Sequence, residues 1–219
     1  MKIIMNIYKK DDEIATKNIV PQKRVYGEQL FEENGEEFRI WNPHRSKLAA
    51  AFLNGLEKLE IAEDWKILYL GASTGTTVSH ISDIAKDGLI YAVEFSPTSM
   101  RKLNRLCENR PNIVPLLADA TKPKEYLNLV EKVDFIYCDV AQPNQTDAFI
   151  DNIKLFLKED SLSMIMIKSR SIDVSQKPQK VFKQEEKKLI AKGFGVIEKI
   201  KLEPYEKDHV CFLVEEKFK

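Results

Sequence analysis

Short apolar strands and amphipathic helices alternate along residues 66–192 of this chain. The strands are expected at residues 66–70, 89–95, 113–117, 133–140 and 163–168. The helices are expected at residues 76–85, 97–109, 123–130, 145–157 and 178–192. Alternation at this spacing predicts an α/β fold, in which helices cover both faces of a mainly parallel sheet.

The two ends of the chain depart from this alternation. Residues 195–202 and 209–215 have the pattern of strands, and the six residues between them are too few for a crossover helix. We therefore expect the last strand to run antiparallel to its neighbour. Near the start, residues 2–8 and 36–41 also have the pattern of strands.

Turn signals and a helix cap suggest where the chain divides. Asn34-Gly35 and Asn42-Pro43 are typical of turns, and Ser46 is a suitable N-cap for an apolar-periodic helix over residues 47–60. We expect a small N-terminal β subdomain over residues 1–45 and a second, larger domain over residues 46–219.

Composition narrows the class of protein. The chain has 219 residues, of which 43% are hydrophobic and 31% charged, as in a globular protein. No segment approaches the roughly 20 apolar residues of a membrane span, and no signal peptide is recognisable, so we expect a cytoplasmic protein without a membrane partner. Cys107, Cys138 and Cys211 form no C-x-x-C pair, so we expect reduced core residues and no metal site.

The segment after the first core strand reads Gly71-Ala72-Ser73-Thr74-Gly75-Thr76-Thr77. Small residues let the backbone approach a ligand, and the following helix N-terminus favours a carboxylate or phosphate. The segment lacks the G-x-G-x-x-G spacing of a dinucleotide site and the lysine of a P-loop. A methyltransferase-type loop fits better, although a plain strand-to-helix turn would have the same glycines.

Acidic residues follow three of the expected strands. Glu94 ends the second strand, about 20 residues after the loop, where a carboxylate can bind both ribose hydroxyls of an adenosine. Asp119 follows the third strand and Asp139 ends the fourth. Open α/β sheets bind ligands at the carboxyl ends of their strands, so the shared position indicates a nucleoside cofactor.

Longer motifs resemble those of the fibrillarin family over nearly the whole chain. They are residues 69–80 (YLGASTGTTVSH), 91–96 (YAVEFS), 139–146 (DVAQPNQT), 41–49 (WNPHRSKLA), 167–173 (IKSRSID) and 202–209 (LEPYEKDH). The chain lacks the Gly/Arg-rich N-terminal tail of eukaryotic members and so resembles the archaeal form. Ser73-Thr74 stands where Ala-Ser is common, and residues 158–161 lack the usual glycines; both departures concern turns.

The resemblance implies a Rossmann-like methyltransferase fold that uses S-adenosylmethionine. It implies 2′-O-methylation of ribosomal RNA, with transfer RNA as a further substrate. The expected partners are a Nop-type scaffold protein, a kink-turn-binding protein and a box C/D guide RNA. Thirty-four basic residues balance thirty-four acidic ones, which agrees with an enzyme that relies on partners for most phosphate contacts.

The resemblance also assigns site residues. Those expected to line the cofactor site are Gly71, Thr76, Thr77, Glu94, Phe95, Asp119, Ala120, Asp139, Val140, Ala141 and Gln142. Similar RNA 2′-O-methyltransferases use a Lys-Asp-Lys-Glu/His set, which Lys47, Asp139, Lys168 and His209 match. Lys168 would act as general base or hydrogen-bond anchor for the 2′-hydroxyl, oriented by Asp139. Lys47 would lower the pKa of Lys168, and His209 would position the oxygen.

Several alternatives stay open. The chain could be a protein (glutamine) methyltransferase, a non-catalytic scaffold subunit of the same particle, or a nucleotide-dependent oxidoreductase, and the loop spacing disfavours the last. Isolated lysines at strand ends are commonly solvated. Two groups of basic residues are further candidates for RNA contact: Lys177, Lys180, Lys183, Lys187 and Lys188 on one helix, and Arg45, Arg101, Lys102 and Arg105 elsewhere.

Overall fold

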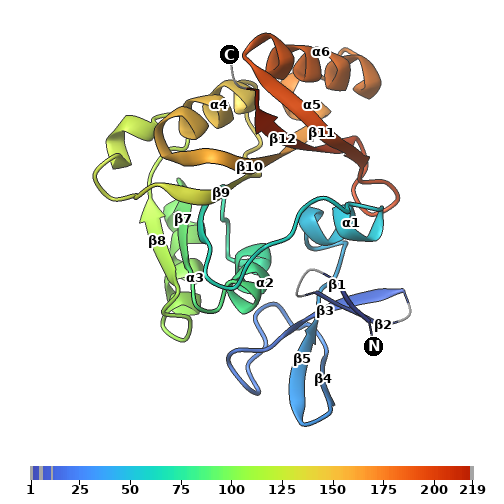
Figure 1. Ribbon diagram of the computed structural model, residues 1–219, viewed down its shortest axis with the longest axis vertical. Coiled ribbons are helices and arrows are strands. Elements are labelled where there is room, and N and C mark those ends of the chain that lie inside the picture. The colour runs from blue at the N-terminus through green and yellow to red at the C-terminus, as the bar shows by residue number, and fades with distance from the viewer. Residues whose placement is uncertain (1, 5–6, 11, 218–219) are drawn as a thin grey trace.

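The computed structural model describes residues 2–4, 7–10 and 12–217 of the chain. Over these ranges the strands form a five-stranded sheet, at the lower right of Figure 1, and a seven-stranded sheet that runs from the top of the view down its left side. The larger sheet has the order β11-β12-β10-β9-β6-β7-β8. Its strands are β6 (Lys66–Leu70), β7 (Leu89–Glu94), β8 (Ile113–Leu117), β9 (Val133–Cys138), β10 (Leu157–Lys168), β11 (Phe194–Lys201) and β12 (His209–Glu216).

The larger sheet has the predicted mixture of strand directions. The strands β8, β7, β6, β9 and β10 pair in parallel, whereas β12 is antiparallel to both β10 and β11. The carboxyl ends of the parallel strands therefore meet along one edge, which is where open α/β sheets bind ligands. The predicted α/β class and the antiparallel last strand are both confirmed.

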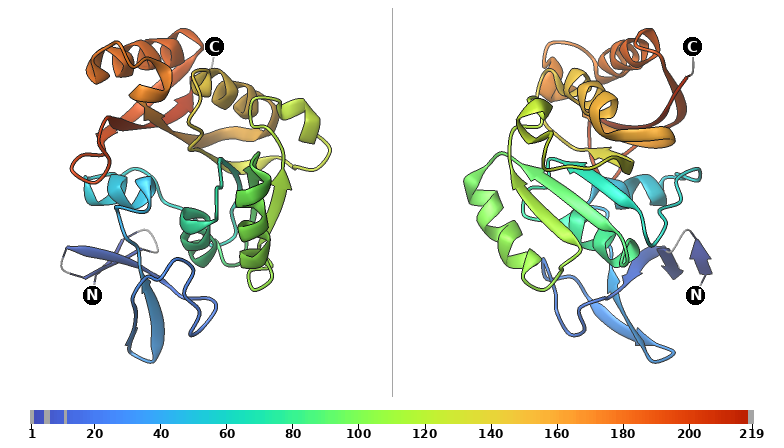
Figure 2. Two further views of the ribbon diagram at one scale, coloured as in Figure 1. Left: turned by 180° about the vertical axis from the view of Figure 1, so that it is seen from behind. Right: turned by 60° about the vertical axis from the view of Figure 1, so that its left-hand side comes forward.

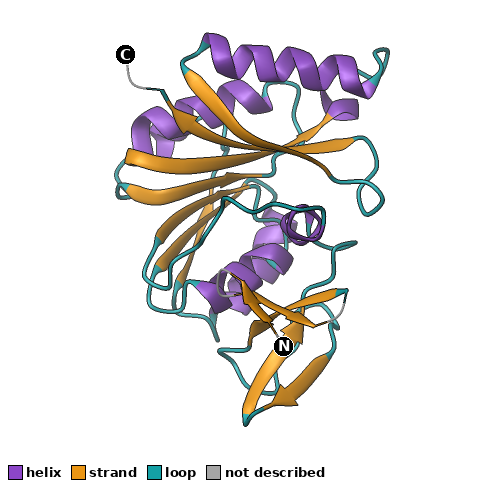
Figure 3. Cartoon of the chain, turned by 45° about the vertical axis from the view of Figure 1, so that its right-hand side comes forward, coloured by secondary structure: helices purple, strands orange, loops and turns teal. Residues whose placement is uncertain are grey.

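Helices cover both faces of this sheet, as Figure 3 shows. One apolar cluster joins the sheet to α1 (Lys47–Leu53), α2 (Thr76–Ile84) and α3 (Pro97–Cys107). A second cluster joins the opposite face to η1 (Pro123–Tyr126), α4 (Gln145–Phe156), α5 (Ser169–Ile172) and α6 (Pro178–Ala191). Both views of Figure 2 show this layering. Within the described ranges, no helix is long and apolar enough to cross a membrane.

The small N-terminal sheet is antiparallel throughout and has the order β1-β2-β3-β5-β4. Its strands are β1 (Lys2–Ile4), β2 (Ile7–Lys10), β3 (Glu13–Lys17), β4 (Leu30–Glu33) and β5 (Glu36–Ile40). The strand expected at 36–41 is confirmed, and the one expected at 2–8 is two strands, with residues 5 and 6 outside the described part. Strands β3 and β4 were not predicted from the sequence.

Three predicted boundaries were wrong. Helix α1 ends at Leu53 rather than near residue 60, because Gly55 turns the chain with a left-handed φ of 97°. The segment expected as a helix over 123–130 has only a short 3₁₀ turn, η1. Strand β10 begins at Leu157, six residues early, and its pairing with β9 shifts register between Leu157 and Leu162.

A buried polar cluster joins the small sheet to α2. Asp83 of α2 accepts hydrogen bonds from Thr16 (2.7 Å, at Oδ2) and Arg110 (2.7 Å, at Oδ1), and its Oδ2 also lies 3.2 Å from Nε of Arg39. His80 contacts Thr16 through Nδ1, at 2.7 Å. Because buried charges are costly unless paired, this cluster fixes the small sheet in one position against the Rossmann-like sheet.

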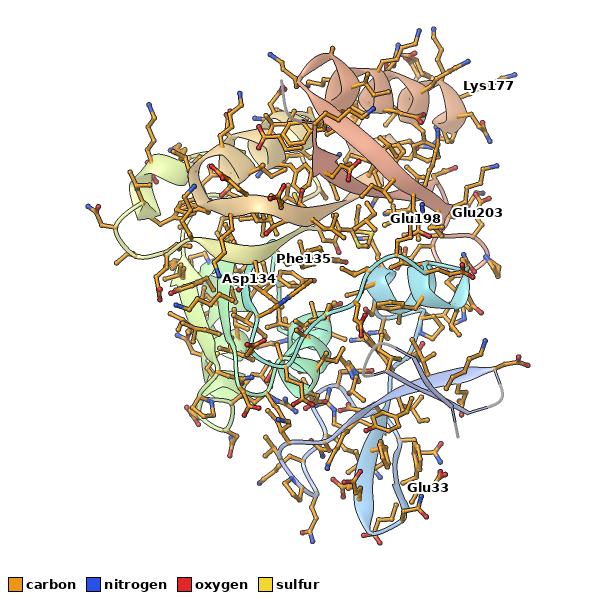
Figure 4. All side chains as sticks on the ribbon, viewed as in Figure 1. Glu33, Asp134, Phe135, Lys177, Glu198 and Glu203 are labelled. Carbon is orange, nitrogen blue, oxygen red and sulfur yellow. The ribbon has the colours of Figure 1, made fainter. Side chains whose placement is uncertain are left out.

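The C-terminal end of helix α1 is attached to β11 and to the loop after β11. The Asn54 side chain donates hydrogen bonds to the carbonyls of Lys201 (2.7 Å) and Glu203 (2.9 Å). The Glu198 carboxylate accepts hydrogen bonds from two backbone N–H groups just beyond the helix. Figure 4 labels Glu198 and Glu203 beside α1. These contacts place the start of α1, with Lys47, beside the edge of the sheet where the strands end.

Candidate active site

The glycine loop after β6 is held tightly against the neighbouring strands. The N–H groups of Gly71 and Ala72 both donate to the carbonyl of Val93, at 2.9 and 3.0 Å. Gly71 has a φ of 85°, and a Cβ added there would lie 2.5 Å from the carbonyl oxygen of Asp139. Only glycine therefore fits at position 71, and the loop passes directly beside the backbone of Asp139.

Glu94 at the end of β7 fixes the other side of the loop. Its carboxylate is buried and accepts hydrogen bonds from the N–H groups of Ser73 (2.8 Å) and Ser96 (2.8 Å), one on each oxygen. An ionised carboxylate has about four lone-pair sites, so Glu94 keeps acceptor capacity for a ligand's hydroxyl groups.

A cavity of about 380 Å³ opens between this loop and the ends of β7 and β9. Eight of the predicted cofactor-site residues line it: Gly71, Glu94, Phe95, Ala120, Asp139, Val140, Ala141 and Gln142. Five further lining residues were not predicted from the sequence: Ser73, Val93, Ser96, Ser99 and Ala118. The available signal was their position in the loop, at or just after the ends of β7 and β8, and in the first turn of α3. The Phe95 ring is 65% exposed, so one of its faces is free for stacking.

Three predicted cofactor residues are not among those lining this cavity. Thr77 is buried and donates a hydrogen bond to Ser46, at 2.9 Å. Thr76 lines a different cavity on the other side of the loop. Asp119 accepts hydrogen bonds through Oδ1 from the N–H (2.9 Å) and hydroxyl (2.8 Å) of Thr121, as in an Asx turn.

Lys47 and Asp139 form a half-buried ion pair at the cavity wall. The distance between Lys47 Nζ and Asp139 Oδ1 is 2.5 Å. Burial alone would lower the pKa of Lys47, but the adjacent Asp139 carboxylate and its hydrogen bond outweigh it, so the pKa is raised. Lys47 is therefore a stable cation, and it holds the Asp139 carboxylate in place.

Lys168 lies on β10, the strand next to β9, and His209 lies on β12, the strand beyond it. Lys168, the exposed last residue of β10, is paired with His209, the first residue of β12. His209 Nδ1 lies 2.7 Å from the carbonyl oxygen of Lys207. Burial, aided by the Lys47 charge, lowers the pKa of His209 against the opposing effects of this carbonyl and nearby carboxylates, Asp139 among them. The predicted four residues therefore meet at one edge of the sheet.

The three cysteines are free thiols. Cys138 and Cys211 are buried, whereas Cys107 is half-buried. Burial raises the pKa of the Cys138 thiol to about 12. Across the residues that the structure describes, no group of His, Cys, Asp or Glu side chains is arranged to hold a metal ion.

Comparisons with known proteins agree with this geometry. The fibrillarin family model matches residues 2–218. A fibrillarin-like rRNA/tRNA 2′-O-methyltransferase from Methanocaldococcus jannaschii is 52% identical, covering 97% of this chain and 94% of its own length. Fibrillarin from Aeropyrum pernix, solved with natively bound S-adenosyl-L-methionine, superposes with a TM-score of 0.87 at 46% identity, over 95% of this chain and 92% of that one.

A third similarity is to fibrillarin in a fibrillarin/Nop5p complex. The TM-score is 0.91 at 42% identity, and the match covers 99% of this chain and 100% of that one. The similarity thus extends over both sheets and the strand ends that carry the site. By the match of the family model and the identity with these relatives, the chain belongs to the fibrillarin family.

Proposed function

We propose that this protein transfers a methyl group from S-adenosylmethionine to the ribose 2′-hydroxyl of ribosomal RNA, and of transfer RNA as a further substrate. The observation that carries the proposal is the Lys47–Asp139 pair at the wall of the 380 Å³ cavity, with Lys168 and His209 on the adjoining strand ends. The M. jannaschii relative is named for this reaction on rRNA and tRNA.

The residues around the cavity fit S-adenosylmethionine. A volume of about 380 Å³ lies within the usual range for small-ligand sites, about 300–1,000 Å³. The Glu94 carboxylate is placed to accept hydrogen bonds from ribose hydroxyls, and the exposed Phe95 ring to stack on a base. The bound cofactor would supply a methyl group on a sulfonium, which is open to attack by an oxygen nucleophile.

In this proposal, the four polar residues act on the 2′-hydroxyl. It is a weak nucleophile, so the enzyme must align the oxygen and accept its proton. Lys168 is exposed at the end of β10 and serves as general base or hydrogen-bond anchor. Asp139, held by Lys47, balances the charge that develops beside it, and His209 positions the oxygen.

The pairing of Asp139 changes one part of the sequence-based hypothesis. Asp139 was expected to orient Lys168, yet its ion-pair partner in the structure is Lys47. We therefore assign Lys47 and Asp139 as one positioning unit that faces Lys168. The proposed repulsion between Lys47 and Lys168 is weakened by this arrangement, because the carboxylate lies against the Lys47 ammonium.

The proposed setting is a box C/D guide ribonucleoprotein in the cytoplasm. The superposition on fibrillarin from the fibrillarin/Nop5p complex supports a Nop-type scaffold as partner. A kink-turn-binding protein and a guide RNA complete the proposed particle, and the guide would select the nucleotide.

We also propose that the chain divides into a β subdomain over residues 1–45 and a methyltransferase domain over residues 46–219.

Replacing Lys168 by Ala tests the assignment. The variant should bind S-adenosylmethionine as the wild type does in calorimetry but lose methyl transfer to a target RNA in the assembled particle. Lys158→Ala is a matched control, because Lys158 lies on the same strand at the opposite end of the sheet. Near-normal turnover by Lys168→Ala would refute the role of Lys168.

Two further outcomes separate the alternatives. Transfer to a glutamine side chain of a protein, with none to RNA, would favour a protein methyltransferase. Cofactor binding and particle assembly without any transfer would favour a non-catalytic scaffold subunit.

A further inference from the structure

A second cavity lies on the other side of the glycine loop and has a strongly basic lining. Its volume is about 490 Å³, and it is bounded by residues 20–26 of the N-terminal segment, Arg45, the loop residues Thr74 and Thr76, and the C-terminal half of α3. The cationic residues that line it are Lys23, Arg24, Arg45, Lys102, Arg105 and Arg110. No carboxylate is among its lining residues.

Only one of these six cations has a carboxylate partner within the part of the chain that the structure describes. Arg110 is buried and bonded to Asp83, at 2.7 Å. The other five are exposed and lie in no ion pair between described residues, while Arg45 is placed over the ring of Tyr26, at 5.8 Å. Unpaired cations around one hollow concentrate positive potential, even in a chain with zero net charge.

The basic cavity is next to the proposed reaction site. Arg45 at its rim is two residues before Lys47, so their Cα atoms are at most about 7 Å apart. Ser46 between them caps α1 and accepts the hydrogen bond from Thr77. The loop that lines the cofactor cavity with Gly71 and Ser73 thus lines the basic cavity with Thr74 and Thr76.

We infer that this basic cavity binds the phosphodiester backbone of an RNA strand beside the nucleotide that is methylated. The inference rests on the proposed function and adds the place where the strand is held. Exposed Lys and Arg side chains bind phosphates without reading sequence, which suits an enzyme whose target is chosen by a guide. The cavity fixes the register of the strand, and Lys47, Asp139, Lys168 and His209 act on the sugar.

The double variant Lys102→Gln/Arg105→Gln tests this inference, because both side chains are exposed on α3 and neither belongs to the catalytic set. The probe is a short, labelled single-stranded oligoribonucleotide, titrated against the full-length protein over a range of salt concentrations. Each phosphate contact to a single strand contributes about 0.7 to the slope of log K against log salt. Loss of two contacts should lower the slope by about 1.4 and weaken binding about 25-fold at about 0.1 M salt.

Lys180→Gln/Lys183→Gln is the matched control. It removes the same charge from exposed positions of α6, the helix that begins just after the Lys177 labelled in Figure 4. This control should leave both slope and affinity unchanged. An oligodeoxyribonucleotide of the same sequence should bind the wild type with similar affinity, and the Lys102→Gln/Arg105→Gln variant should lose affinity for it to the same extent. The reason is that the cavity contacts phosphates rather than the 2′-hydroxyl.

Measurements in the assembled particle identify which strand is held. An increased KM for the substrate RNA in the Lys102→Gln/Arg105→Gln variant, at saturating guide, assigns the substrate strand. A weakened titration with guide RNA assigns the guide strand instead. In either case the affinity for S-adenosylmethionine should stay at the wild-type value.

Three results would overturn the inference. One is a wild-type protein that fails to bind the oligoribonucleotide at low salt. Another is a double variant with the slope and affinity of the control. The third is a double variant that binds RNA normally but no longer binds its protein partner, since the cavity would then be a protein interface. All three differ from failure of the proposed function, in which wild-type protein binds RNA but transfers no methyl group.

Discussion

Replacing Gly71 by Ala should damage stability and activity together. The new methyl group would lie 2.5 Å from the carbonyl oxygen and 2.9 Å from the carbonyl carbon of Asp139. Ordinary contact between such atoms requires about 3.5 Å, so the loop or Asp139 must move by about 1 Å. The left-handed φ of 85° adds about 1–2 kcal/mol of backbone strain, and the overpacking about 1–3 kcal/mol. We expect a loss of about 2–5 kcal/mol in the free energy of unfolding.

The same movement should disturb the Lys47–Asp139 pair. A shift of about 1 Å would stretch the 2.5 Å separation of its atoms to the limit of a hydrogen bond, and misplacement on this scale costs about 10²-fold in rate. Urea unfolding and methyl-transfer turnover measure the two effects.

The variant Gly55→Ala separates the effect of backbone strain from that of the steric clash at position 71. Gly55 also has a left-handed φ, of 97°, but an added Cβ meets nothing within 4 Å. This variant should lose only about 1–2 kcal/mol of stability and keep its turnover. If Gly71→Ala unfolds at the same urea concentration as Gly55→Ala and turns over like the wild type, then the loop does not set the position of Asp139.

Two predictions concern the buried cluster between the small sheet and α2. Asp83→Asn should lower the free energy of unfolding, measured in urea, by about 3–5 kcal/mol, because Arg39 and Arg110 lose a buried carboxylate. The control Lys17→Ala removes an exposed ion pair and should change the free energy of unfolding little. Equal losses in the two variants would contradict the role of the buried cluster. Burial, aided by Arg39 and Arg110, holds the pKa of His80 well below its usual 6.5, so the unfolded chain binds the proton first. The free energy of unfolding should fall as the pH drops below about 6.5, and His80→Gln should reduce the slope of this fall by up to about 1.4 kcal/mol per pH unit. The same slope in His80→Gln and the wild type would refute the role of His80.

The main sheet was predictable because its strands carry their own signal. Strands such as β6 and β9 are short apolar runs between helical patterns, and parallel order follows from the alternation. The small sheet was harder, since β3 and β4 each have only four or five residues and include charged ones. Such strands form because a neighbouring strand pairs with them, and the local sequence does not indicate that pairing.

The site residues at strand ends were predictable, whereas the contacts between their side chains were not. The positions of Glu94, Asp139 and Lys168 follow from the topology. The sequence does not report that Asp139 bonds to Lys47, 92 residues away. Nor does it report that Thr77 bonds to Ser46 rather than lining the cavity. These contacts depend on how α1 and the glycine loop pack together.

The basic cavity illustrates the same limit. Arg45, Lys102 and Arg105 were candidates for RNA contact on charge alone, like the lysines of α6. Only the fold brings the first set together with Lys23 and Arg24 around one hollow beside the reaction site.

We propose that the methyl group goes to a ribose 2′-hydroxyl at the site formed by Lys47, Asp139, Lys168 and His209. The most direct measurement compares two target RNAs in the assembled particle, one natural and one with a single 2′-deoxy substitution at the target nucleotide. With labelled S-adenosylmethionine, we expect label on the natural RNA and none on the 2′-deoxy RNA, although both should bind equally well. Equal labelling of the two RNAs, or labelling of protein alone, would contradict it.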